Sequence, residues 1–275
     1  MLRKTALALV AVATIAACSK VPISGRKQMN LLPESQLVGM GSSAYQQALA
    51  ENPPITGTPE ANMVKTVGAR IADGATRYLT MKKMSERVAG FKWEYNLLNS
   101  PDINAWCLPG GKIAVYSGIL PVTQTEAGLA TVMAHEVAHA VARHGNERMS
   151  QGLLAQAGGI ALDVYLSQNP TASADMFRQA YGVGATVGVL LPYGRLQESE
   201  ADKLGLVFMA MAGYNPQEAV GFWERMRNAK KGTGAPPEFL STHPSDATRI
   251  ADIKKYLPTA MHYYEKYGSG VASNP

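Results

Sequence analysis

Residues 129–145 read LATVMAHEVAHAVARHG and contain the motif His-Glu-x-x-His. On a helix of 3.6 residues per turn, positions four apart differ in direction by only about 40°, so His135 and His139 can reach one metal ion. Glu136 lies beside them, where a carboxylate can act as a general base. The spacing therefore predicts a zinc site that carries its own base.

The alternative interpretation is a pair of helix histidines that bind nothing. The chain has 5 histidines among 275 residues, so a chance match to the motif has a probability of roughly one in a hundred from composition alone. Two imidazoles and a carboxylate are also costly to bury among apolar residues unless they pair or bind a metal. Composition and context both favour the zinc site.

The helix that carries the motif is expected to begin at Thr123 and to end at Gly145. Thr123 followed by Glu126 is the capping-box pattern of a helix start, and glycine is typical just beyond a helix end. On one continuous helix, His144 is turned about 180° from His135. We therefore expect His144 to point away from the metal, as a helix-end or supporting histidine, and the third ligand to come from elsewhere.

A candidate third ligand lies in residues 195–205, which read RLQESEADKLG. Glu198 and Asp202 are four apart and share a helix face, so one carboxylate can bind the metal while the other orients a ligand imidazole. Glu200 is expected to point to the other side. The alternative is an acidic, solvated helix start. Beside a motif that lacks its third ligand, we favour the metal-binding role, because two histidines, one carboxylate and a water form an open, catalytic zinc site.

These motifs, followed by STHP at residues 241–244, resemble the HtpX-like and BepA-like zinc metallopeptidases, gluzincins related to the CAAX prenyl proteases, over about residues 30–257. The resemblance implies an α+β, mostly helical zincin-type domain that binds one zinc ion and hydrolyses peptide bonds in unfolded or misfolded proteins. It implies a metal site of His135, His139 and Glu198, and catalytic roles for Glu136, Asp202 and His243.

The resemblance also places His243 close to the metal, where it can fill the open position in a resting state. A histidine that caps the following helix is the alternative. Arg249 lies a turn into that helix, where it can pair with an acidic residue or polarise a carbonyl. The residues alone do not choose between these roles.

Short segments in which β-forming residues alternate with polar ones, 92–97 and 112–116, predict a small β-sheet beside the motif helix. Between them lie Asn104, Ala105 and Trp106. These residues are interpreted either as a strand edge with a packed Trp or as an exposed edge on which an extended substrate pairs. The similarity to gluzincins favours the substrate-binding edge.

Residues 1–17 have the pattern of a secretory signal peptide, with a basic start, a short apolar stretch and small residues before Cys18. The small residues resemble a bacterial lipobox. That resemblance implies a lipidated Cys18. Ser19 at the next position resembles the sorting signal of outer-membrane lipoproteins, which implies a location on the periplasmic face of the outer membrane of a Gram-negative bacterium. An ordinary signal peptide cut near Ala17 is the alternative.

The rest of the chain is divided by its composition. We expect a polar tether over residues 18–33, a metallopeptidase domain over 34–258, and a flexible tail over 259–275. Within the domain, helical patterns occupy about 33–51 and 60–79. Residues 152–192 are interpreted as an excursion that covers the cleft, because their most apolar run is too short to span a bilayer.

The composition limits the classes of binding partner that the sequence predicts. The formal charge of +5 and the scattered lysine pairs do not predict a nucleic-acid partner. The expected partners are unfolded or misfolded protein substrates, the membrane through Cys18, and envelope assembly machinery. A competing hypothesis is a chaperone or assembly scaffold, with zinc stabilising a peptide cleft and little proteolysis.

Overall fold

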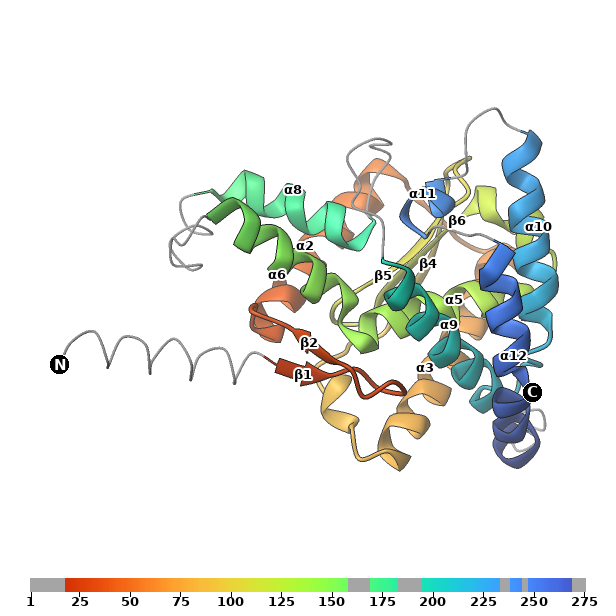
Figure 1. Ribbon diagram of the computed structural model, residues 1–275. Helices are drawn as coiled ribbons and strands as arrows, with labels where there is room; N and C mark the ends of the chain where they lie inside the picture. The colour runs from red at the N-terminus through yellow and green to blue at the C-terminus, as the bar shows by residue number, and fades with distance from the viewer. Residues whose placement is uncertain (1–17, 158–168, 183–193, 233–237, 244–246, 269–275) are drawn as a thin grey trace.

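The computed structural model describes residues 18–157, 169–182, 194–232, 238–243 and 247–268. A small β-sheet lies among helices, and α10 and α12 stand on the opposite side of the molecule from the N-terminal strands (Figure 1). This arrangement confirms the predicted mostly helical α+β fold.

The helices of the described part are α2 (Glu34–Glu51), α3 (Pro59–Met81), α4 (Leu120–Thr123), α5 (Glu126–Ala142), α6 (His144–Ala157), α8 (Pro170–Tyr181), α9 (Arg195–Met211), α10 (Glu218–Gly232), α11 (Glu238–Thr242) and α12 (Ala247–Tyr263). The strands are β1 (Cys18–Lys20), β2 (Lys27–Met29), β3 (Pro54–Ile55), β4 (Glu94–Leu98), β5 (Ala105–Leu108) and β6 (Lys112–Tyr116). The helices expected at 33–51 and 60–79 are α2 and α3, and the expected strands are β4 and β6.

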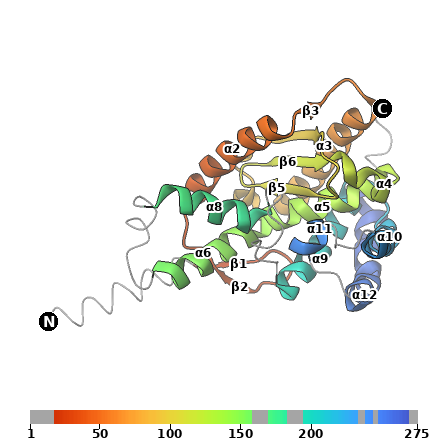
Figure 2. The same ribbon diagram turned by 90° about the horizontal axis from the view of Figure 1, so that it is seen from above.

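The main sheet has the order β3-β4-β6-β5, in which β4 and β6 run parallel and the other pairs antiparallel. Alternate side chains enter two different cores, as strand geometry requires. Leu97 and Val115 pack into the core shared with α3, α5 and α9. Leu98 and Trp106 pack against residues of α2 and α8, and Figure 2 shows α2 on one side of the strands with α5 on the other.

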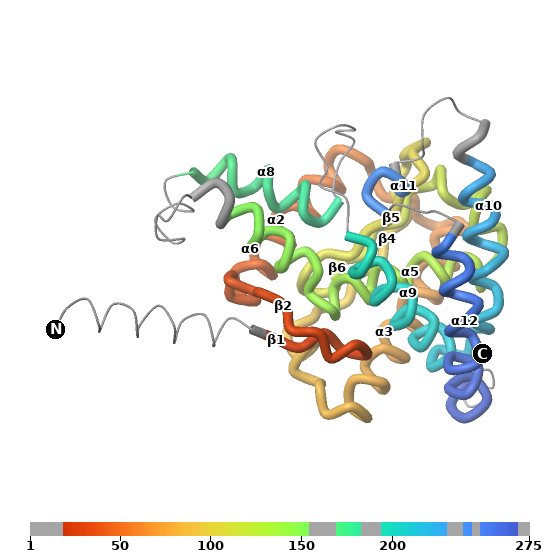
Figure 3. The backbone as a smooth tube through the Cα atoms, viewed as in Figure 1, coloured from red at the N-terminus to blue at the C-terminus, as the bar shows by residue number. Residues whose placement is uncertain are grey.

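Helices α5 and α9 form the most extensive helix contact, and they lie side by side through the middle of the molecule (Figure 3). Residues Gly128–Ala142 of α5 are all buried. Gly205 of α9 permits the close approach, since a Cβ there would lie 3.2 Å from the backbone nitrogen of His135. The packing places the acidic face of α9 beside the histidines of α5.

The motif helix differs from its predicted bounds. Thr125, not Thr123, caps it by accepting a hydrogen bond from the backbone nitrogen of Gly128 at 2.9 Å, while Thr123 ends α4. The helix ends at Arg143, whose backbone is left-handed at φ 61° and ψ 33°. Gly145 lies in the next helix, so the expected end there is wrong.

Both expected flexible ends are ordered where the structure describes them. The predicted tether at 18–33 is instead a hairpin, in which β1 pairs with β2 and Val21 and Leu32 are buried. The predicted tail at 259–275 continues α12 and then forms a π-helical turn, Tyr264–Gly268, with Ala260 fully buried. Burial of a few apolar side chains orders both segments, although their polar composition suggested a tether and a tail.

Several expectations fall outside the described residues. Residues 1–17, 158–168, 183–193 and 269–275 are among the segments left undescribed, so the signal peptide and the covering role of 152–192 stay predictions. Lipidation of Cys18 also stays a prediction. Among the described helices, none is long and apolar enough to cross a membrane.

Candidate metal centre

Four buried side chains converge between α5 and α9. They are His135, His139, Glu198 and His243, and one possible ligand atom from each lies within 4.8 Å of all the others. His139 Nε2 is 3.2 Å from Glu198 Oε1, and His135 Nε2 is 3.5 Å from Glu198 Oε2. The two motif histidines and the predicted third ligand are therefore brought together.

This donor set fits a zinc ion. Imidazole nitrogens and a carboxylate oxygen are the usual ligands of catalytic zinc. Buried polar atoms normally have a hydrogen-bond partner, yet Glu136 Oε1 has none. An acceptor atom of this kind suits a water molecule bound beside a metal ion.

The protonation states also suit metal binding. Burial lowers the pKa of His139 well below its usual value and that of His243 to about 4, and neutral imidazole is the form that binds metals. Burial alone would raise the pKa of Glu198, but its interactions with His243 and with the Arg249 guanidinium outweigh burial and hold this pKa well below its usual range. His139 and His243 thus offer neutral imidazoles beside an ionised carboxylate.

Glu136 is the basic group of the site. Its carboxylate is buried, and its Oε1 lies 3.4 Å from His243 Nε2. Burial raises the pKa of Glu136 to about 8. A carboxyl group whose pKa lies near the working pH can both take up and release a proton, as general acid–base catalysis requires.

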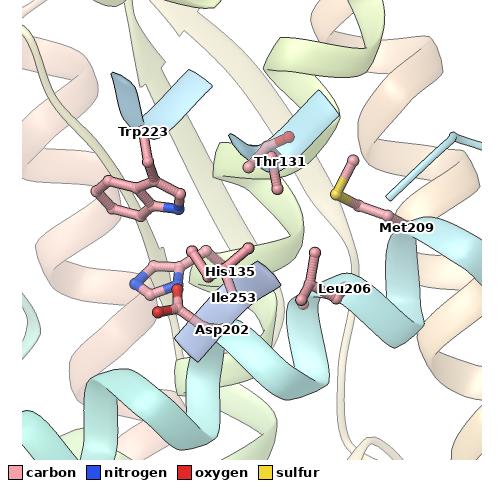
Figure 4. A pocket seen from close by; sticks show the side chains of 9 residues that line it. Thr131, His135, Asp202, Leu206, Met209, Trp223 and Ile253 are labelled. Carbon is pink, nitrogen blue, oxygen red and sulfur yellow. The ribbon is translucent and has the colours of Figure 1, made fainter. Parts of the chain in front are cut away.

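Asp202 orients the first motif histidine. Its Oδ1 is 3.0 Å from His135 Nδ1, and Figure 4 shows the carboxylate beside the imidazole, near Trp223. Burial lowers the pKa of His135, but hydrogen bonds with Asp202 and Glu198 raise it to about 9 overall. With Nδ1 held by Asp202, His135 turns Nε2 towards the other donors.

Arg249 pairs with the acidic residues of the site, the first of its two possible roles. It donates to Asp202 from Nε at 2.9 Å and from Nη2 at 2.7 Å. Its Nη1 lies 2.7 Å from Glu198 Oε2, an ion pair without hydrogen-bond alignment. The guanidinium carbon is 3.4 Å from the ring centroid of Trp223, a cation–π contact that fixes its plane.

His144 does not point away from the site as expected. Its Nδ1 is 2.9 Å from Nδ1 of His139, and its Nε2 is 3.1 Å from Glu200 Oε2. The prediction assumed one continuous helix, whereas the left-handed Arg143 turns the chain just before His144. Asp202 therefore supports His135, and His144 supports His139. A supporting role was one of the two expected for His144, and only its expected direction was wrong.

Comparison with known proteins agrees with this geometry. The sequence pattern of Peptidase family M48 matches residues 63–257, well over half of the chain. The chain belongs to peptidase family M48. This membership confirms the family resemblance and establishes the protein as a zinc metalloendopeptidase.

Individual M48 relatives span both eukaryotes and bacteria. The chain is 36% identical to mitochondrial metalloendopeptidase OMA1 of Schizosaccharomyces pombe, over 88% of this chain and 67% of the relative. It is 32% identical to OMA1 of Saccharomyces cerevisiae, over 90% of this chain and 71% of the relative. It is 24% identical to the beta-barrel assembly-enhancing protease of Escherichia coli K12, over 85% of this chain and 46% of that protein.

The proposed substrate edge of this M48 peptidase is strand β5. It lies at the end of the sheet order, next to α5. Trp106 is 1% exposed and packs edge-on against Tyr45, as the packed-Trp interpretation expects. Asn104 and Ala105 are also buried, and the nearby carbonyl of Ile103 accepts a hydrogen bond from the backbone nitrogen of Phe239 at 3.1 Å. The backbone of Ile103, next to this edge, is therefore already paired with α11.

Proposed function

We propose that this M48 peptidase cleaves unfolded or misfolded proteins at a zinc ion held by His135, His139 and Glu198. The observation that carries the proposal is the convergence of these three side chains around one point, with the unpartnered Glu136 Oε1 beside them. Recognition through strand β5 favours extended chains, because a sheet edge pairs with the backbone of its partner. Folded proteins rarely offer such a segment.

Each residue of the site has a defined role in this proposal. Zinc, when bound, supplies Lewis-acid activation of a water molecule and of the scissile carbonyl. Glu136 takes the water proton through its Oε1 and passes it to the leaving amine. Asp202 fixes the ring of His135, and Arg249 holds the carboxylates of Asp202 and Glu198 in place.

His243 is proposed to hold this site in a resting state. Its Nδ1 is 3.0 Å from Glu198 Oε1 and its Nε2 faces Glu136, so the ring fills the space between the proposed ligand and the proposed base. Phe239, four residues earlier, stacks on the His243 ring with centroids 4.5 Å apart. The segment 239–243 must move before a peptide enters.

Replacement of His243 with alanine is therefore expected to increase casein cleavage by about 10-fold, equivalent to removing about 1.4 kcal/mol of competition for the site. The initial cleavage rate of zinc-loaded protein on casein, with a folded globular protein as the comparison substrate, measures both this effect and the preference for unfolded chains. His262→Ala, an exposed change on α12, should leave the rate unaltered. A lower rate in His243→Ala with zinc retained would make His243 part of catalysis and contradict its restraining role.

We also propose that the enzyme is anchored by Cys18 to the periplasmic face of the outer membrane and works in envelope protein quality control. The signal-peptide pattern and the lipobox resemblance support this location, and an Escherichia coli relative is named for β-barrel assembly. Other relatives are named as mitochondrial, so the location depends on the N-terminal sequence rather than on the family.

Mass spectrometry of the mature N-terminus is expected to show a lipid-modified Cys18, because the small residues before it match the cleavage pattern. Cys18→Ser should move the protein from the membrane fraction to the salt wash. An unmodified cysteine, or an unaltered protein that salt releases, would disprove the anchor while leaving the peptidase assignment intact.

A further inference from the structure

The N-terminal hairpin is fastened to the end of the motif helix. Gln28 of β2 is buried and donates from Nε2 to the backbone oxygen of Ala142 at 2.6 Å. Arg87 donates to the backbone oxygen of Val141 and also to that of Lys20 in β1. These contacts satisfy carbonyls in the last turn of α5 that have no partner within the helix. The hairpin thus sits directly behind the half of α5 that carries His139.

Arg26, in the turn of this hairpin, joins two buried carboxylates. Its Nη1 and Nη2 lie 2.6 and 2.8 Å from the two oxygens of Glu147. Its Nε and Nη2 each lie 3.0 Å from an oxygen of Glu200. Ser24, in the same turn, also donates to Glu200. Paired hydrogen bonds from a planar guanidinium fix the orientation of a carboxylate as well as its charge.

Glu200 connects Arg26 to the metal site through His144. Its side chain is only 2% exposed, and its Oε2 lies 3.1 Å from His144 Nε2. The other ring nitrogen of His144 is 2.9 Å from His139 Nδ1. Four side chains therefore run in unbroken contact from the hairpin turn to a residue of the metal centre. His135 needs no such chain, because Asp202 contacts it directly.

We propose that Arg26 is a positioning residue of the zinc site, holding the ligand His139 through Glu200 and His144, so that the β1–β2 hairpin is part of the metal centre. The proposal rests on the role of His139 as a zinc ligand. Without Arg26, Glu200 keeps a buried charge with weaker support and loses its fixed orientation. His144 and His139 then sample more ring positions, and zinc binds less tightly.

The test compares variants of the purified full chain for zinc affinity, by competition with a chromogenic chelator, and for the visible absorption of the cobalt-loaded protein. We expect Arg26→Gln to weaken zinc binding by about 10-fold, the lower end of the usual range for groups that orient metal ligands. The cobalt bands should shift, because they report the ligand geometry. Ser24→Ala, a milder change, should weaken binding by about 3-fold.

Arg178→Gln is the matched control. Arg178 is 26% exposed and pairs with Glu51, against 23% for Arg26, and this pair is not part of the contact chain that reaches His139. It should change neither zinc affinity nor the cobalt spectrum. In a Glu200→Gln background, Arg26→Gln should add less than about 2-fold, because residues that act through one network are not additive.

The outcomes separate the two levels of the proposal. His139→Ala must lose zinc binding; if it does not, the ligand assignment fails and the positioning role of Arg26 falls with it. If His139→Ala loses zinc while Arg26→Gln and Ser24→Ala keep both the affinity and the cobalt spectrum of the unaltered protein, only the hairpin proposal is overturned. Far-ultraviolet circular dichroism checks that each variant is folded, and Ser24→Ala decides the question should Arg26→Gln not fold.

Discussion

Replacing Glu198 with alanine is expected to lower zinc affinity by more than about 100-fold. Loss of a group that only orients a ligand costs about 10- to 100-fold, and loss of a ligand itself exceeds that. Glu198 is also the only carboxylate among the four converging donors, so its removal leaves three imidazoles and no negative charge at the ion. Casein cleavage should disappear with the zinc.

The measurement is the zinc dissociation constant by chelator competition, with metal content checked by atomic absorption. Glu224→Ala is the control, since Glu224 is a half-exposed glutamate of α10 that forms an ion pair with Lys254 at 3.7 Å. It should bind zinc like the unaltered protein. If Glu198→Ala still binds one zinc ion with unaltered affinity, another residue is the third ligand and the centre proposed here is wrong.

Replacing Glu136 with glutamine is expected to reduce kcat/KM for peptide cleavage by at least about 100-fold and up to about 10,000-fold. That range is the usual contribution of a general base. The amide has nearly the same shape as the carboxylate but cannot take a proton from water. Zinc affinity should change little, because Glu136 is not among the four converging donors.

The Glu136→Gln variant also distinguishes the peptidase hypothesis from the hypothesis of a chaperone or assembly scaffold. Cleavage is followed by gel and by mass spectrometry of the products, and function in the cell by complementation of a deletion strain. A chaperone that cleaves little would keep its cellular function in Glu136→Gln, whereas a peptidase would lose it. Cleavage at an undiminished rate in this variant would exclude Glu136 as the base.

The convergence of the proposed metal ligands could be predicted because much of their geometry is local. Positions 135 and 139 share a face of any helix, and positions 198 and 202 do so on another. In the structure the two faces meet. Asp202 contacts the imidazole of His135, and Glu198 lies beside His139. Helical periodicity, together with the family motifs, was enough for this half of the site.

The support of His139 could not be predicted in the same way. It depends on a single backbone conformation, the left-handed Arg143, which ends α5 early and turns His144 back towards the site. It also depends on Glu200, which does face away from Glu198 as expected but meets His144 there. His144 and Glu200 were the residues in the sequence that could have indicated this support, but only tertiary packing brings them into contact.

The two ends of the chain show the limit of composition. Residues 18–33 and 259–268 are polar enough to suggest a tether and a tail, yet Val21, Leu32 and Ala260 are buried in the domain. Sequence periodicity is weak in segments this short, and their order comes from contacts with residues far along the chain. One such contact, from Arg26 to Glu200, joins the hairpin to the catalytic helices.

The central claim is that peptide cleavage depends on one zinc ion at this centre. Its most direct test is to titrate zinc into the metal-free protein and to follow bound zinc and casein cleavage together. We predict that both rise in parallel and stop at one zinc ion per chain. Cleavage by the metal-free protein, or cleavage that appears only after further zinc binds, would contradict the account.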